Sequence, residues 1–148
     1  MAFIRIVRST PLPVTQTWRL LTDWERHGAH VPLTRTVVGT APPTRVGTLF
    51  TARTGVGRFA FDDPMEVVAW QPPGAGGGGY VRLEKRGRVV TGWAEIEVLP
   101  APDGASGSRV VWREALRVRG LPRPLDPPLT TAATALFTHA LTALLHEP

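Results

Sequence analysis

The side chain in this sequence best placed to transfer a proton is Glu114. It interrupts a strand-like segment whose residues of the same parity are otherwise apolar, so its carboxyl group is expected to face the interior. A carboxyl group there must be paired with a cation, reached by water or a polar ligand, or protonated. Two interpretations stay open: an ion pair with an inward-facing arginine such as Arg53, and a role as a polar ligand contact or general acid or base.

Two histidines, His27 and His30, could assist such chemistry because histidine changes its charge near neutral pH. They lie in a polar segment after the first helical residues, where a histidine is usually solvated. As metal ligands they lack a third partner nearby, whereas a catalytic zinc normally has three protein ligands. The sequence therefore predicts no metal site.

No signature of a cofactor occurs. The chain has no cysteine, which excludes disulfides, thiolate zinc sites and cysteine nucleophiles. It also lacks a G-x-S-x-G elbow, a phosphate-binding loop and a dinucleotide fingerprint, since Gly55 and Gly57 lie in a predicted strand turn rather than before a helix. We expect no cofactor.

The elements that would position these groups follow from hydrophobic periodicity. Residues 3–7 alternate as a strand does, and Pro11 and Pro13 then lead into a helix and a second short helix over residues 24–27. After a long proline-marked connection, strands are predicted at residues 47–54, 58–61, 65–70, 80–85, 89–99 and 109–118, with a glycine-rich loop at 74–79. A helix over residues 129–145 closes the chain. This order predicts one α+β domain over residues 1–148, a meandering antiparallel sheet wrapped on one long helix.

The faces of the last three strands follow from two predicted turns. A two-residue turn at Arg86 and Gly87 gives the first hairpin, and a loop over residues 100–108 gives the second. The predicted cross-strand partners are Lys85 with Arg88, Leu83 with Val90, Val81 with Gly92, Gly92 with Leu116, Ala94 with Glu114, Ile96 with Trp112 and Val98 with Val110. One face is then apolar apart from Glu114, and its small residues Gly92 and Ala94 leave volume that close packing would normally fill. The sequence thus indicates an internal cavity.

The opposite face carries mixed charge, with Glu95 opposite Arg113. The net charge is +5, but paired charges and the lack of interleaved aromatic residues speak against a nucleic-acid site. No apolar run reaches the length of a membrane span, and Arg5 and Arg8 interrupt the N-terminal segment where a signal peptide would be apolar. We expect no membrane span and a cytoplasmic location.

The chain resembles the polyketide cyclase/dehydrase and START-related superfamily, also called SRPBCC. The segments that carry the resemblance are IRIVRSTPLPVTQTWRLLTDWERH, VVGTAPPTRVGTLFTA, FDDPMEVVAWQPPG and the closing amphipathic helix. The resemblance implies a helix-grip fold around a hydrophobic cavity and a hydrophobic ligand such as a lipid, a polyketide or an aromatic molecule. It implies no mechanism, because the superfamily has no universal catalytic residues.

The predicted cavity combines apolar walls with a few polar groups. The residues expected to contact a ligand are Trp24, His27, His30, Phe50, Arg53, Phe59, Phe61, Met65, Gly92, Ala94, Trp112 and Glu114. The predicted function is non-catalytic binding of a hydrophobic small molecule, as a carrier or sensor. The alternatives are an enzyme of the cyclase or dehydratase type that uses Glu114 as acid or base, and a protein-interaction module.

The last predicted helix carries no charged residue from Leu129 to Leu145. Its outer face is a strip of small hydroxyl side chains, Thr131, Thr134, Thr138 and Thr142, which Leu145 would extend. Small uncharged residues permit close approach, so a homodimer through this helix is one interpretation. The other interpretation is that water hydrates the hydroxyl groups of this threonine face.

Overall fold

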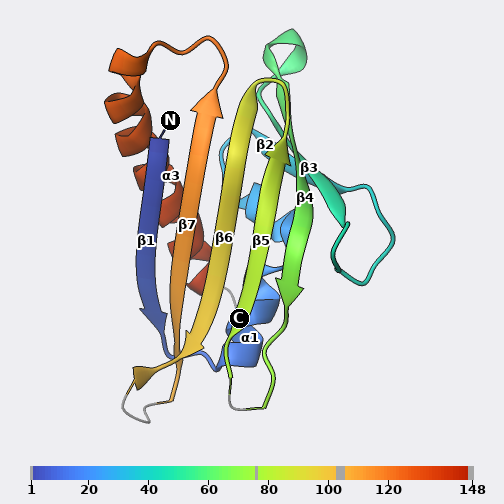
Figure 1. Ribbon diagram of the computed structural model, residues 1–148, viewed down its shortest axis with the longest axis vertical. Helices are drawn as coiled ribbons and strands as arrows, with labels where there is room; N and C mark the ends of the chain where they lie inside the picture. The colour runs from blue at the N-terminus through green and yellow to red at the C-terminus, as the bar shows by residue number, and fades with distance from the viewer. Residues whose placement is uncertain (1, 76, 103–105, 147–148) are drawn as a thin grey trace.

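The protein folds as an antiparallel sheet with helices on one face (Figure 1). The computed structural model describes residues 2–75, 77–102 and 106–146. Its strands are β1 (Ala2–Thr10), β2 (Thr34–Val38), β3 (Leu49–Thr54), β4 (Phe61–Gln71), β5 (Gly79–Arg86), β6 (Val90–Pro100) and β7 (Ser108–Val118). Its helices are α1 (Val14–Leu21), α2 (Trp24–Ala29) and α3 (Asp126–His146), with short 3-10 turns η1 (Gly57–Phe59) and η3 (Arg123–Leu125).

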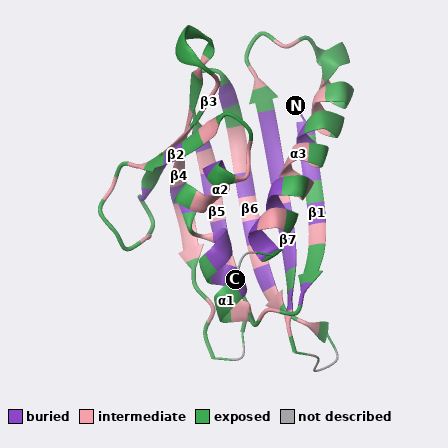
Figure 2. Cartoon of the chain, turned by 180° about the vertical axis from the view of Figure 1, so that it is seen from behind, coloured by how far each residue is buried: buried purple, intermediate pink, exposed green. Residues whose placement is uncertain are grey.

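The sheet has the order β1-β7-β6-β5-β4-β3-β2, so the first strand pairs with the last. All neighbouring strands are antiparallel. The sheet is curved, and α3 and the two short helices lie behind it in Figure 1 and in front of it in Figure 2. The predicted α+β class and the helix-grip architecture are confirmed.

Prolines mark the starts of α1 and α3. Pro13 precedes α1 with extended backbone, and Trp18 and Leu21 turn the apolar side of this helix toward the core. The last helix begins at Asp126, three residues before the predicted start, because Pro127 and Pro128 occupy its first turn. Proline is tolerated there since the first-turn N–H groups have no partner within the helix.

Two strand predictions were wrong. Strand β2 lies in the segment between Pro32 and Pro42 that the sequence analysis treated as a connection, and it pairs with β3. Residues 58–61 do not form a separate strand, because η1 makes the turn between β3 and the start of β4. The predicted and observed numbers of strands between α2 and α3 agree only because the additional strand β2 offsets the strand that is missing at residues 58–61. Within the predicted 74–79 loop, Gly76 lies outside the described residues.

The predicted β6–β7 register is confirmed: Ala94 is opposite Glu114 and Ile96 is opposite Trp112. The predicted β5–β6 register is wrong. Leu83 is opposite Ala94, and the turn spans residues 87–90 instead of two residues. The carbonyl of Val89 accepts a hydrogen bond from the amide of Arg119, which draws this residue out of the β5 ladder. The observed β5–β6 register differs from the predicted one by an even number of residues, so each side chain keeps its predicted face of the sheet.

The outer face of the sheet carries the predicted opposite charges. Glu95 is opposite Arg113 in the register, as expected. Its ion pair, however, is with Arg82 at 3.2 Å, and Arg113 contacts Glu97 at 3.5 Å. These side chains are partly exposed, and such pairs contribute little to stability.

Helix α3 packs against β1 through its C-terminal half, where Leu141 and Leu144 are fully buried. Leu145 is also buried, so it does not extend the outer threonine strip as predicted. Thr131 and Thr142 are exposed and donate to carbonyls of their own helix. Self-association through this face stays a prediction.

Residues Arg123–His146 are long and apolar enough to cross a membrane by length and composition alone, contrary to the expectation from sequence. One such helix is weak evidence of a membrane span, because mostly buried core helices pass the same test; 22% of this window is buried.

Candidate functional site

A cavity of about 370 Å³ lies between the sheet and the N-terminal half of α3. Small-molecule sites typically have volumes of about 300–1,000 Å³. Strands β2 to β7 contribute side chains of one parity each, and α3 contributes residues that include Leu129, Ala133, Leu136 and Phe137. These helix residues include partly exposed side chains because they face the cavity rather than the packed core. In Figure 2 the N-terminal turns of α3 are mostly green, the colour of exposed residues, with pink intermediate positions among them.

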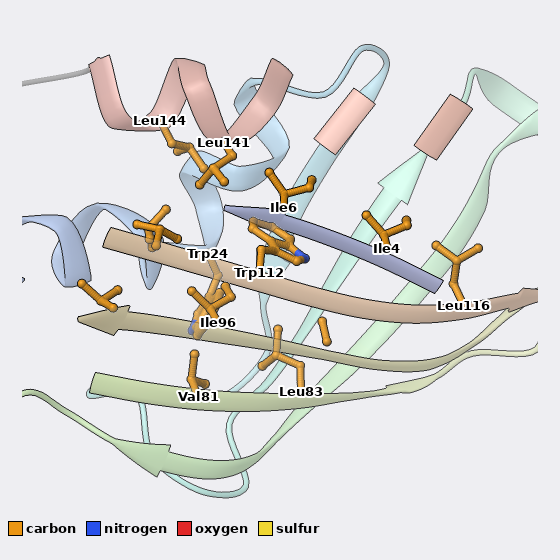
Figure 3. Packing of buried hydrophobic residues seen from close by; sticks show 14 of the residues in the cluster. Ile4, Ile6, Trp24, Val81, Leu83, Ile96, Trp112, Leu116, Leu141 and Leu144 are labelled. Carbon is orange, nitrogen blue, oxygen red and sulfur yellow. The ribbon is translucent and has the colours of Figure 1, made fainter. Parts of the chain in front are cut away.

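Aromatic rings form much of the wall. Trp24 from α2 stacks on Phe50 from β3, with ring centroids 4.6 Å apart and planes 7° apart. Trp112 from β7 lies 6.0 Å from Phe137 of α3, also nearly parallel. Figure 3 shows Trp24 and Trp112 on the helix-covered side of the sheet, near Ile96. Such walls suit flat aromatic or alkyl ligands.

A buried group of three charged residues, Asp63, Lys85 and Glu114, lies in this wall; we call it the charged triad. The ammonium nitrogen of Lys85 lies 2.7 Å from Asp63 Oδ2 and 3.2 Å from Glu114 Oε1. The indole N–H of Trp112 donates to Glu114 Oε2 at 3.1 Å. The side chains of Lys85 and Glu114 are 5% and 3% exposed, and that of Asp63 is 14% exposed, so two members of the triad are buried and the third is partly accessible.

The triad keeps its lysine protonated. Burial by itself would lower the pKa of Lys85, but the negative charges of Glu114 and Asp63 together outweigh it and raise the pKa above its ordinary value. A protonated lysine is no nucleophile, so this residue is unsuited to forming a Schiff base. Its role is that of a fixed cation.

The strand register explains how Lys85 and Glu114 meet. Lys85 is on β5 and Glu114 is on β7, so the ion pair spans the intervening strand β6. The β6 residues beneath this span are Gly92, opposite Lys85, and Ala94, opposite Glu114. A large side chain at Ala94 would fill the space that the ion pair crosses, whereas a Cβ at Gly92 would meet the carbonyl oxygen of Ala115.

Lys85 and Asp63 were not among the site residues predicted from sequence. Lys85 shares its parity with Val81 and Leu83, so alternation alone assigns it to the inner face, and it is the only lysine in the chain. Asp63 shares its parity with Phe61 and Met65 in the same way. At Lys85, a charged residue on a predicted apolar face was therefore a usable signal. Asp63 lies between the predicted strands 58–61 and 65–70, so no face was predicted for it. The partner of Glu114 is Lys85 and not Arg53.

Eight of the predicted contact residues line the cavity. They are Trp24, His27, Phe50, Phe61, Met65, Ala94, Trp112 and Glu114. Their contact with a ligand stays a prediction. His30 and Arg53 instead line an open depression of about 730 Å³, which adjoins the cavity through Gly28, Val31 and Thr34. This depression is larger, but it lacks the enclosing aromatic wall, and we regard it as the mouth rather than the binding site.

Three predicted contacts are corrected by the structure. Arg53 faces away from the cavity and pairs with Asp62 at 3.0 Å, because its parity on β3 is opposite to that of Phe50. Phe59 lies in η1 and is 79% exposed. Gly92 has a φ of 134°, and an added Cβ would overlap the carbonyl oxygen of Ala115. Glycine is therefore required there by backbone conformation rather than as a wall of the cavity.

His27 is a cavity residue with a fixed tautomer. Its Nε2–H donates to the carbonyl oxygen of Leu21, and its ring lies 5.7 Å from that of Trp112. Burial lowers the pKa of His27 below its ordinary value, and this outweighs the opposing effects of the Leu21 carbonyl and of Asp23. His27 is therefore neutral at neutral pH.

Because His27 stays neutral in the folded protein, the free energy of unfolding should depend on pH. In the unfolded chain it takes up a proton below about pH 6.5, whereas in the folded protein it resists protonation. The free energy of unfolding should thus fall as the pH decreases from 6.5 through the lowered folded pKa, with a slope from this group of at most about 1.4 kcal/mol per pH unit. Urea denaturation from pH 7.5 to 5 should show a smaller decrease for His27→Gln than for the parent. The exposed His139→Gln variant is the control, and an unchanged slope in His27→Gln would contradict the assignment.

In the described part of the chain, no group of three or more histidine, aspartate or glutamate side chains is arranged to bind a metal ion.

Comparison with known proteins identifies the fold. No protein-family model matches the chain, and no curated protein sequence matches it. Solved structures do match over nearly the whole length. A START superfamily protein from Mycobacterium smegmatis is 9% identical, with a TM-score of 0.73 over 98% of this chain and 97% of that one. A Thermobifida fusca protein is 17% identical, with a TM-score of 0.70 over 98% and 91%. Ara h 8.0201 is 10% identical, with a TM-score of 0.62 over 98% of both chains.

The chain thus has the fold of START superfamily proteins, and the resemblance noted from sequence is confirmed at the level of fold. At identities this low, the similarity establishes architecture and leaves the ligand and any reaction to be argued from the cavity.

Proposed function

We propose that the protein binds a hydrophobic small molecule in the cavity, as a non-catalytic carrier or sensor. The observation that carries this proposal is a partly open cavity of about 370 Å³ with aromatic walls and one charged triad. Protein interiors are normally packed without voids of this size, so a retained cavity favours an occupant. The resemblance from sequence implies the same class of ligand.

A catalytic role for Glu114 has less support. Its Oε1 pairs with Lys85 and its Oε2 accepts from Trp112, so both oxygens already have donors. A general base needs an oxygen that can reach a proton of the substrate. An acid or base role would require Glu114 to exchange one of these partners during turnover.

Filling the cavity tests the proposal. Ala94 is 2% exposed and lines the cavity between Leu83 and Glu114. Ala94→Phe should abolish binding of prodan, a neutral naphthalene dye whose emission reports an apolar site, because the added ring occupies the ligand's space. Overpacking costs about 1–3 kcal/mol, so circular dichroism must first show that the variant is folded.

The control variant is Ala135→Phe, which makes the same substitution at an exposed position of α3. It should bind prodan as the parent does. Parent-like binding by a folded Ala94→Phe variant would refute the cavity as the site, and so would absence of prodan binding by the parent. Native mass spectrometry of protein purified from its own source would identify the class of the natural ligand.

A further inference from the structure

The strand register brings η1, the β5–β6 turn and the β7–α3 connection to one end of the sheet (Figure 1). An added Cβ on Gly87 would lie 3.2 Å from Pro64, so the β5–β6 turn lies beside the start of β4. The amide of Arg119 donates to the carbonyl of Val89, which joins the β7–α3 connection to the same turn. Residues 55–60, 86–90 and 117–125 therefore gather at one end of the molecule, which we call the η1 end.

Exposed apolar side chains are concentrated at the η1 end. Phe59 is 79% exposed and Val56 is 66% exposed. Val89 in the β5–β6 turn and Leu125 in η3 are also exposed, by 38% and 45%. Single exposed apolar residues are common on protein surfaces, whereas a group of them marks a surface that contacts a partner.

The backbone holds the tip of this surface in place. Gly55 has a φ of 115°, and an added Cβ there would overlap the carbonyl oxygen of Phe59. Glycine adopts such a φ without steric cost. The amide of Phe59 donates to the carbonyl of Val56 at 3.0 Å, which closes the turn. The turn therefore presents an aromatic ring to water, and burial of this ring against an apolar partner would be favourable.

The η1 end is also cationic. Five exposed arginines there form no ion pair with another residue of the described ranges: Arg58, Arg88, Arg117, Arg119 and Arg123. Three of them, from the β5–β6 turn and the β7–α3 connection, line one shallow depression. The carboxylates close to these loops are Asp62, which pairs with Arg53, and Asp126 at the start of α3.

We propose that the η1 end docks on an anionic lipid bilayer. Val56 and Phe59 would enter the boundary between head groups and acyl chains, while the arginines contact lipid phosphates. Association with such a surface increases with the buried apolar area and with the attraction of cations to anionic lipids, and the η1 end offers both. A nucleic acid would match the arginines but leave the apolar tip in water. An apolar protein surface would cover the tip but leave the arginines without anions.

Docking would bring the mouth of the cavity to the bilayer. Phe61, the first residue of β4 after η1, lines the cavity, and Leu33 and Gly55 line the mouth. A hydrophobic ligand would then exchange between acyl chains and cavity with little exposure to water. This exchange rests on the proposed function, whereas docking itself does not.

Vesicle flotation tests docking. The whole chain is mixed with vesicles of phosphatidylcholine alone, or of equal parts of phosphatidylcholine and phosphatidylglycerol. The protein should float with the anionic vesicles and not with the neutral ones. The affinity should decrease at least about tenfold when the salt concentration rises from about 0.1 M to about 1 M, because the Debye length shortens from about 10 Å to about 3 Å. Equal flotation with both kinds of vesicle would contradict the role of the arginines.

Removing two arginines should weaken docking. Arg119→Gln with Arg123→Gln should lower the affinity for anionic vesicles at least about tenfold, since each arginine near such a surface contributes about fivefold. The control, Arg8→Gln with Arg109→Gln, removes the same charge from exposed positions at the opposite end of the β1–β7 pair. It should change the affinity by less than about threefold. An equal loss in the control would show that binding follows net charge and not this surface.

A fluorescent label reports insertion of the tip. The chain has no cysteine, so Val56→Cys can be labelled at a single site with NBD, a dye whose emission rises in an apolar environment. Its emission should rise and shift to the blue on anionic vesicles. NBD on Val46→Cys is the control, because Val46 is 59% exposed in the connection between β2 and β3. It should not respond, and a silent label at Val56 in protein that floats would refute insertion.

The remaining outcomes separate docking from ligand binding. If prodan binds but the protein does not float with anionic vesicles, the docking proposal fails and the cavity proposal stands. If the protein floats but prodan does not bind, docking stands and ligand exchange fails. Sedimentation equilibrium without lipid tests a second copy of the chain as the partner. A dimer that Phe59→Ser dissociates, in protein that does not float, would overturn the proposal.

Discussion

Replacing Lys85 with methionine is expected to lower the free energy of unfolding by about 3–5 kcal/mol, the usual loss when one partner of a buried ion pair is removed. Methionine keeps most of the apolar length of the lysine side chain, so little packing is lost. What disappears is the ammonium group that serves both Asp63 and Glu114, at 2.7 and 3.2 Å. Two carboxylates then remain in the wall without a cation. Urea denaturation at pH 7 measures the difference.

The control is the next residue, Arg86, whose ion pairs with Glu84 and Glu66 are about half exposed. Arg86→Met should change stability by less than about 1 kcal/mol. A loss of that small size in Lys85→Met would show that the triad is hydrated rather than buried. The stabilisation by Lys85 should be fully present below pH 10.5, the ordinary pKa of lysine, and decline only as the pH rises through the raised folded value.

The fold was largely predictable because it follows from local patterns. Alternation identified the strands β5, β6 and β7, and the apolar face of residues 129–145 identified α3. The predicted partners Ala94 and Glu114 are opposite each other because the whole β6–β7 pairing obeys one parity. Where the pattern was weak the prediction failed: β2 lies between prolines that indicate a loop, and η1 carries residues that read as a strand.

The candidate site was predictable only in part. Parity places Trp112, Phe50 and Ala94 on the inner face, and all three line the cavity. The partner of Glu114 could not be found in this way, because Lys85 lies two strands away and reaches it over β6. Pairing across a skipped strand depends on sheet curvature and on small residues between the two side chains. Neither is encoded in the alternation of a single strand.

Removing all charge from the triad should restore most of the stability that Lys85→Met loses. The variant Lys85→Met with Asp63→Leu and Glu114→Gln contains no buried charge, and the Gln carbonyl can still accept from Trp112. Replacing a buried ion cluster by uncharged residues is often neutral or stabilising by about 1–4 kcal/mol. We expect its free energy of unfolding to lie within about 1.5 kcal/mol of the parent value.

The same triple variant should still bind prodan, because the aromatic wall of the cavity is unchanged. The matched comparison is the single variant Lys85→Met, measured in the same urea series. A triple variant as unstable as Lys85→Met would show that the wall depends on the packing of the native side chains and not on their charges. That outcome would contradict the expected recovery.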